Sequence, residues 1–185
     1  IGEVYKKLGK YQEALDYFLK ALVLARKHEA ADKDGDSVGV LYNEIGSIYT
    51  EMGNFILSLS YLNRAHTIFK QLGNRQRLAE SRYYFGELAL KQNNYSQAKT
   101  HFLEALNYAQ AISALDIIAD ANHQLSKIFE LEGNIPQAYN HYKKYITYRD
   151  SIFNEDNMKR MVQAEMLYQF EREMHDAKVE QAKRD

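Results

Sequence analysis

A phrase of fixed residue types recurs four times along this chain at an almost constant spacing. Each copy begins with a large apolar residue followed by a small one, and three of the four have an aromatic residue three positions later. A period of about 40 residues is typical of a solenoid, in which supersecondary units stack on their neighbours. Successive copies begin 44, 40 and 40 residues apart, at Ile1-Gly2, Ile45-Gly46, Phe85-Gly86 and Leu125-Ser126.

Each copy reads as two helices joined by a short turn. From Leu41 to Met52 the apolar residues recur at helical steps, and Gly53 then provides a left-handed terminator before a second apolar run. Two helices joined this closely pack antiparallel, and small residues such as Gly46 and Ser58 allow close approach. We therefore predict an all-α fold, an α-α superhelix of four helix-turn-helix repeats plus a long C-terminal helix. The predicted segments are residues 1–37, 38–77, 78–117 and 118–153 for the repeats and 154–185 for the final helix.

Composition excludes several functional classes. The net charge is −1, so there is no electrostatic case for nucleic-acid binding. The chain has no cysteine, which excludes disulfides and thiol chemistry, and it has one proline, Pro136, at the expected start of a helix. No apolar run approaches the roughly 20 residues that span a bilayer, so no direct membrane insertion is expected in this segment. The compartment stays open between the cytoplasm and a periplasmic part of an anchored sensor.

The repeat resembles the tetratricopeptide repeat family. The small residue after the apolar one and the later alanines match that family in order, over roughly residues 1–150. The repeats are longer than the usual ~34 residues, so we expect helices about a turn longer. The family's leading tryptophan is absent, with Tyr42, Arg82 and Asn122 in its place. The resemblance implies a non-catalytic module that binds a protein or peptide, without a cofactor.

The segment after Tyr145 does not begin a fifth copy. Asn154, followed by two acidic residues, has the composition of a helix N-cap, and we predict a helix start there. Leu167, Phe170, Met174 and Ala177 step by three and four, as in a coiled-coil seam. Two interpretations stay open: a helix that caps the last repeat, or a signalling helix through which the chain forms a homodimer.

The end of the array resembles a bacterial group of long-repeat proteins. The phrase at residues 148–155 (YRDSIFNE) and the charged helix at residues 166–173 (MLYQFERE) carry this resemblance. It implies the sensory or scaffold region of a larger signal-transduction protein, before a histidine kinase, a nucleotide cyclase or a helix-turn-helix regulator. The alternative is a free-standing adaptor. Because the first copy begins at Ile1 without its preceding half-helix, we expect the chain to be a piece of a longer protein.

The acidic loop at residues 32–36 has some of the ligand spacing of a calcium site. Asp32, Asp34 and Asp36 occupy ligand positions of an EF-hand loop, but Ser37 stands where glycine is required and Asn43 where the closing glutamate belongs. The four extra residues of the 44-residue spacing explain this loop as a solvated connection. We predict no calcium site.

The histidines and tyrosines have packing explanations. His101 and His141 occupy the repeat position of Tyr17 and Tyr61, His123 stands alone, and no pair has the spacing of a helical zinc site, so no metal site is predicted. Fifteen tyrosines could suggest base stacking, but most fall at expected core positions. Those positions are Tyr5, Tyr11, Tyr42, Tyr49, Tyr95 and Tyr142. Nor does a catalytic triad, phosphate loop or carboxylate pair appear.

The remaining candidate is the concave inner face, which the first helix of each pair should line. Its predicted residues are Glu3, Lys6, Lys7, Asn43, Ser47, Thr50, Tyr83, Glu87, Leu90, His123, Lys127 and Glu130, flanked by Glu44, Glu80, Tyr84, Lys91, Asp120 and Gln124. The Tyr83–Tyr84 pair is the best candidate hot spot, because aromatic residues anchor interfaces. Chaperone-binding members of the resembled family hold a peptide carboxylate in this groove. Here only Asn43 matches, and Glu80 and Asp120 oppose that role, so we predict no carboxylate clamp.

Overall fold

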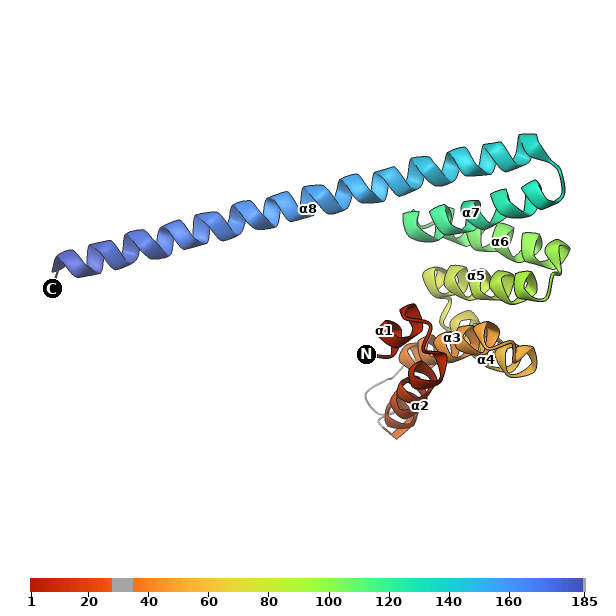
Figure 1. Ribbon diagram of the computed structural model, residues 1–185. Coiled ribbons are helices and arrows are strands. Elements are labelled where there is room, and N and C mark those ends of the chain that lie inside the picture. Colours follow the sequence, from red (N-terminus) through yellow and green to blue (C-terminus); the bar gives the residue numbers. More distant parts are fainter. Residues whose placement is uncertain (28–34, 185) are drawn as a thin grey trace.

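The computed structural model describes residues 1–27 and 35–184, with side chains to Phe170 and at Arg172. These residues form helices without strands, arranged as a stack of antiparallel pairs (Figure 1). Each pair packs on the next, so the predicted superhelix is confirmed. In chain order the helices are α1 (Gly2–Lys7), α2 (Tyr11–Lys27), α3 (Asp36–Glu51), α4 (Phe55–Leu72), α5 (Arg75–Lys91), α6 (Tyr95–Gln110), α7 (Leu115–Leu131) and α8 (Ile135–Arg184).

The turns between helices combine a left-handed residue with an asparagine cap. Gly53 and Gly133 have φ values of 75° and 72°, and Asn93 adopts φ 58° at the equivalent position. The asparagine that follows each of them accepts a hydrogen bond from the third backbone N–H of the next helix, as Asn94 does from Gln97 at 3.2 Å. One residue therefore terminates a helix while its neighbour starts the next.

Close packing within each pair depends on the small residue of the repeated phrase. A Cβ built at Gly46 would lie 2.7 Å from Cδ2 of Leu62, and one at Gly86 would lie 2.6 Å from Cε1 of Phe102. Both partner side chains are completely buried. The glycines thus provide the space into which the second helix inserts a large apolar side chain.

The fourth repeat has Ser126 at the position of that glycine, and its second helix packs differently. Tyr142, the equivalent of Leu62 and Phe102, is 47% exposed, so its predicted core position is wrong. His141 is buried instead, stacked on Phe129 at 5.4 Å and bonded through Nδ1 to Oδ1 of Asn122 at 2.8 Å. The equivalent Leu62 packs against Phe85 and Leu88 of the following repeat, and no described helix follows α8 to cover Tyr142 in the same way.

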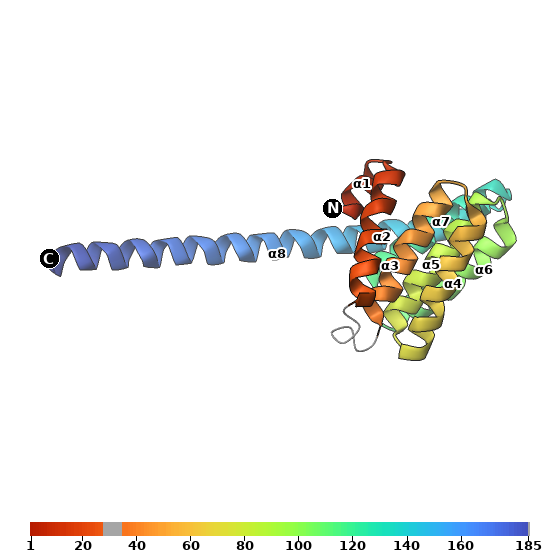
Figure 2. The ribbon, with the colours of Figure 1, turned by 90° about the horizontal axis from the view of Figure 1, so that it is seen from below.

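Helix α8 is a single element from Ile135 to Arg184, so the helix start predicted at Asn154 is wrong. Its first part packs against α7, and its C-terminal part continues away from the stack (Figures 1 and 2). Met158, Val162 and Phe170 are exposed there. The rest of the predicted seam, at Met174 and Ala177, lies outside the described side chains.

Candidate binding groove on the inner face

Two adjoining pockets form one groove across the first helices of the repeats. They have volumes of about 440 and 350 Å³ and share four lining residues, Glu3, Glu44, Tyr83 and Tyr84. The first pocket adds Lys6, Lys7, Tyr11, Ser47, Glu51 and Glu87. The second adds Val40, Arg77, Glu80, Asp116, Ile117 and Asp120. We call this combined surface the inner groove.

A chain of polar contacts crosses the inner groove from α1 to α5. Glu44 on α3 accepts a hydrogen bond from Lys6 Nζ at 2.9 Å on one oxygen and from Tyr84 Oη at 2.7 Å on the other. Burial raises the pKa of Tyr84, and the charge of Glu44 raises it further, so the hydroxyl stays protonated and donates. The Glu44 carboxylate therefore ties three consecutive repeats together.

A second chain of contacts joins the start of α2 to positions about two helical turns further along α3 and α5. Glu51 Oε2 accepts hydrogen bonds from Lys91 Nζ at 2.8 Å and from Tyr11 Oη at 3.4 Å. Between α5 and α7, Gln124 Nε2 donates to Tyr83 Oη at 3.4 Å. Polar contacts thus line the groove at regular intervals across its width.

Glu87 lies between these contacts with an unused acceptor. Its Oε1 is shielded from solvent and has no hydrogen-bond partner among the described residues. Burial raises the pKa of Glu87, and the nearby charges of Glu51 and Asp120 raise it further, while Lys91 and Lys127 oppose that effect. A carboxylate in such surroundings is stabilised by any cation that reaches it.

Most of the predicted site residues line or border the inner groove. The lining residues among them are Glu44, Ser47, Glu80, Tyr83, Tyr84, Glu87 and Asp120. Lys91 and Gln124 border it through the hydrogen bonds described above. Lys127 is exposed and lines neither pocket. His123 stacks on Tyr145 of α8, with ring centroids 4.3 Å apart, and so packs against the second helix of its own pair.

Two predicted surface residues are buried, and their assignment to the groove is wrong. Asn43 is 2% exposed and so is Thr50, whose hydroxyl bonds to Ser58 Oγ at 2.7 Å across the helix pair. Residues 43, 83 and 123 share one repeat position, and all are at least half covered. Asn43 therefore turns into the stack, whereas Tyr83 at the same repeat position lines both pockets. The next residue along, Glu44 or Tyr84, lines both pockets as well.

Six groove residues were absent from the sequence prediction: Tyr11, Val40, Glu51, Arg77, Asp116 and Ile117. Glu51 and Lys91 are 40 residues apart, which is the spacing of the second and third copies. Complementary side chains separated by one repeat length were therefore a signal in the sequence. Extending the predicted row of inner-face positions by one helical turn at each end of the first helices would have included these groove residues.

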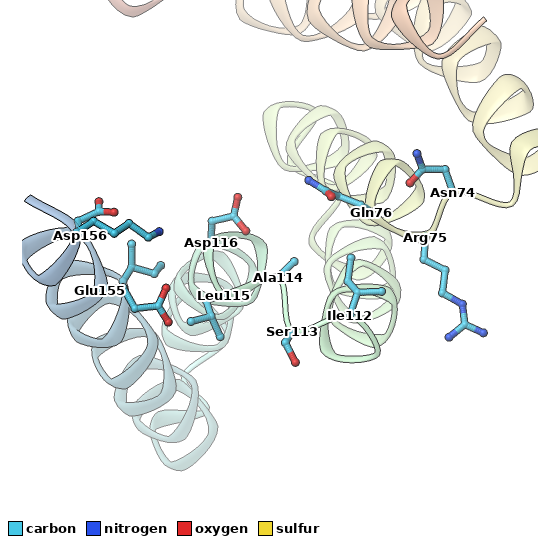
Figure 3. A pocket seen from close by; sticks show the side chains of 12 residues that line it. Asn74, Arg75, Gln76, Ile112, Ser113, Ala114, Leu115, Asp116, Glu155 and Asp156 are labelled. Atoms are coloured by element: carbon cyan, nitrogen blue, oxygen red, sulfur yellow. The ribbon is translucent and has the colours of Figure 1, made fainter. Parts of the chain in front are cut away.

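A third pocket lies where α8 passes the ends of the other helices. It has a volume of about 860 Å³, and Figure 3 shows Glu155 on α8 facing Leu115 and Asp116 at the start of α7, with Asn74 and Arg75 at the far edge. Its lining mixes both charges with small and apolar residues. None of the predicted site residues lines this pocket.

The described part of the chain meets neither the requirements of a metal site nor those of a membrane-spanning helix. Residues 1–27 and 35–184 contain no cluster of three or more potential ligands of the kind that holds a metal ion. Asp32 and Asp34 of the calcium hypothesis lie outside the described residues. No described helix combines the length and apolar character that crossing a membrane requires.

Comparison with known proteins agrees with this architecture. The outer dynein arm-docking complex subunit 4 of Danio rerio is 27% identical over 112 residues, which cover 60% of this chain and 22% of that protein. The transcriptional activator NprA of Geobacillus stearothermophilus is 24% identical over 154 residues, 80% of this chain and 36% of that protein. The chain thus spans well under half the length of these relatives.

Structural comparison gives the same fold. The crystal structure of aspartyl phosphate phosphatase F from Bacillus subtilis superimposes with a TM-score of 0.72 at 17% identity, over 82% of this chain and 39% of that one. Tetratricopeptide repeat families match residues 1–28 and 37–111. These matches together cover the first three helix pairs, apart from Asp36 at the start of α3. The chain therefore belongs to the tetratricopeptide repeat family and is a module of the protein-binding, non-catalytic kind.

Proposed function

We propose that the inner groove holds a peptide or protein segment and that the chain is the ligand-binding region of a larger signalling protein. The observation that carries this proposal is the groove itself, a continuous surface that four consecutive repeats build. Its wall holds a pair of tyrosines, Tyr83 and Tyr84, packed edge to face with centroids 6.3 Å apart. Rigid aromatic side chains of this kind anchor interfaces at low entropic cost.

The relatives support a regulatory setting. One is named as a transcriptional activator and one structural neighbour as an aspartyl phosphate phosphatase, and both are longer than this chain. By this proposal, ligand binding changes how the repeats pack, and α8 carries the change away from the stack. The polar contacts from Lys6 to Glu44 and from Glu44 to Tyr84 cross two repeat boundaries, so a ligand that displaces them alters the spacing of three helices.

A selection experiment tests the groove. A phage-displayed peptide library is panned against the full chain, and enriched peptides are measured against Ser47→Arg, which places a long side chain inside the groove. The matched control is Asn107→Arg on the exposed side of α6. We expect Ser47→Arg to abolish binding and Asn107→Arg to leave it unchanged. Equal binding by both variants would move the site elsewhere on the repeats.

We further propose that α8 forms a homodimer. Its exposed apolar residues include Met158, Met161, Val162, Met166 and Phe170, which no described helix covers. Sedimentation of the full chain should show a dimer that Val162→Lys combined with Met166→Lys dissociates. A chain that stays monomeric at all concentrations rules the dimer out and leaves the groove proposal untouched.

A further inference from the structure

The inner groove holds more acidic than basic side chains. Among the described lining residues there are seven carboxylates and three bases. Three of the carboxylates have a basic partner in the chain at 2.8–2.9 Å. The four with no such ion pair in the described structure are Glu3, Glu87, Asp116 and Asp120.

The protein's own Lys6 shows how this surface holds a cation. Its ammonium contacts the Glu44 carboxylate at 2.9 Å and lies 5.2 Å from the ring centroid of Tyr84. A carboxylate and a tyrosine face together are a favourable setting for a positive charge. Both groups belong to consecutive first helices of the stack, so the pairing is a property of the groove.

Glu87 and Tyr83 present a similar pair of groups one turn away, without a cation. They are four residues apart on α5, and both line the first pocket. The shielded Oε1 of Glu87 accepts no hydrogen bond from the described residues. Neither nearby base forms an ion pair with the Glu87 carboxylate. Lys91 is bonded to Glu51 at 2.8 Å, and Lys127 forms no ion pair in the described structure.

We propose that the inner groove selects a basic peptide, with an arginine or lysine side chain that pairs with Glu87 beside Tyr83. The inference rests on the proposed function of the groove and names the chemistry of its ligand. An incoming guanidinium or ammonium pairs with the Glu87 carboxylate, which lines the groove, and lies near Asp120, which adds favourable charge. An acidic or carboxylate-ended segment meets the unpaired acids and is repelled.

Three peptide libraries test the charge preference. Each holds fluorescent peptides with blocked ends and neutral randomised flanks, which differ only in a central arginine, glutamine or glutamate. Binding to the full chain is followed by anisotropy. We expect the arginine library to bind about tenfold more tightly than the glutamine library, as a charged hydrogen bond allows. The glutamate library should bind most weakly.

The variant Glu87→Gln removes the charge and keeps the shape. It should reduce the affinity for the arginine library about tenfold and leave the affinity for the glutamine library unchanged. Glu13→Gln, on the exposed side of α2, is the matched control and should change neither. Equal binding of the arginine and glutamine libraries overturns the charge preference and retains a peptide-binding groove. If no library binds, the proposed function fails and this inference fails with it.

Discussion

Tyr84 donates a hydrogen bond to Glu44 at 2.7 Å across 40 residues of sequence, from one repeat position to the same position in the preceding repeat. Lys91 and Glu51 are related in the same way at 2.8 Å. Equivalent positions face each other in a stack, so residues one repeat apart become neighbours. These contacts hold consecutive first helices together on the inner face.

Tyr84→Phe should lower the free energy of unfolding by about 1.5 kcal/mol, because a hydrogen bond to a charged acceptor is lost in a mostly buried place. Tyr61→Phe is the control. Its hydroxyl makes no hydrogen bond in the described structure, so the change should be less than about 0.5 kcal/mol. Urea denaturation of both variants measures the difference, and equal losses would show that the contact to Glu44 contributes nothing.

Gly86→Ala should destabilise the third helix pair by about 2 kcal/mol, because the added methyl meets the Phe102 ring at 2.6 Å. The buried ring must move, and α5 and α6 must separate slightly. Ser126→Ala at the equivalent position of the fourth repeat adds no Cβ and should cost less than about 1 kcal/mol. Thermal unfolding compares the two. A harmless Gly86→Ala would mean that the ring shifts without loss of packing.

Acid should weaken the packing of α4, α5 and α6 through two histidines. Burial lowers the pKa of His66 and of His101, and the charge of Arg82 lowers both further. The unfolded chain therefore takes up protons at a higher pH than the folded one. Stability from these groups is complete above the ordinary histidine pKa of about 6.5 and is lost as pH falls below it.

The double variant His66→Gln and His101→Gln isolates this effect. Its melting temperature should fall less between pH 7.5 and pH 5, taken as roughly one unit or more on either side of the ordinary histidine pKa, than that of the unchanged protein. Parallel curves for the two proteins would contradict the prediction. Both proteins carry the same carboxylates, so the effect of carboxylate titration on the melting temperature cancels in the comparison.

Glu87→Gln should raise the melting temperature at neutral pH, because it removes a charge from a largely covered place. Burial raises the Glu87 pKa, so the folded state binds its proton more readily than the unfolded state does. The destabilisation is therefore full at high pH and is relieved as pH falls through the raised pKa. The gain from the variant, about 1 kcal/mol at pH 7, should vanish below pH ~4. A variant less stable than the parent at pH 7 would refute this account.

Deletion of residues 158–185 should leave the melting temperature of the repeats within about 2 °C of the full chain when both are monomeric. The removed part begins with side chains that are mostly exposed, such as Met158 and Met161, so little apolar surface should be uncovered. A large fall in melting temperature would support the interpretation of this segment as a cap.

The repeated phrase was enough to predict the helix pairs and the role of their glycines. The periodicity of apolar residues fixes which helix faces meet, and the spacing of the turns fixes helix lengths of 16 to 18 residues from α3 to α7. The burial of Tyr142 was predicted wrongly because α8 belongs to the last described pair. Its equivalent Leu62 is covered by Phe85 and Leu88 of the following repeat, whereas no described helix covers Tyr142 in that way.

The groove was predicted less well, since a stripe on one helix does not show where the next helix lies. Asn43 and Thr50 face neighbouring helices, and only the positions one residue away reach the open surface. The continuation of α8 through Asn154 could not be inferred from its composition either. A capping residue can also lie inside a helix when the upstream residues favour the same conformation.

The uninterrupted backbone of α8 also has a mechanical consequence. At 1.5 Å per residue its 50 residues extend about 75 Å, of which about 45 Å lie beyond Phe153. In this geometry α8 is a long rod that is held near its N-terminal end by its packing on α7. A tilt of the fourth repeat by about 10° would sweep the far end through about 8 Å by this geometry. A small tilt of the fourth repeat would thus displace the C-terminal end of α8 by more than the rise of one helical turn.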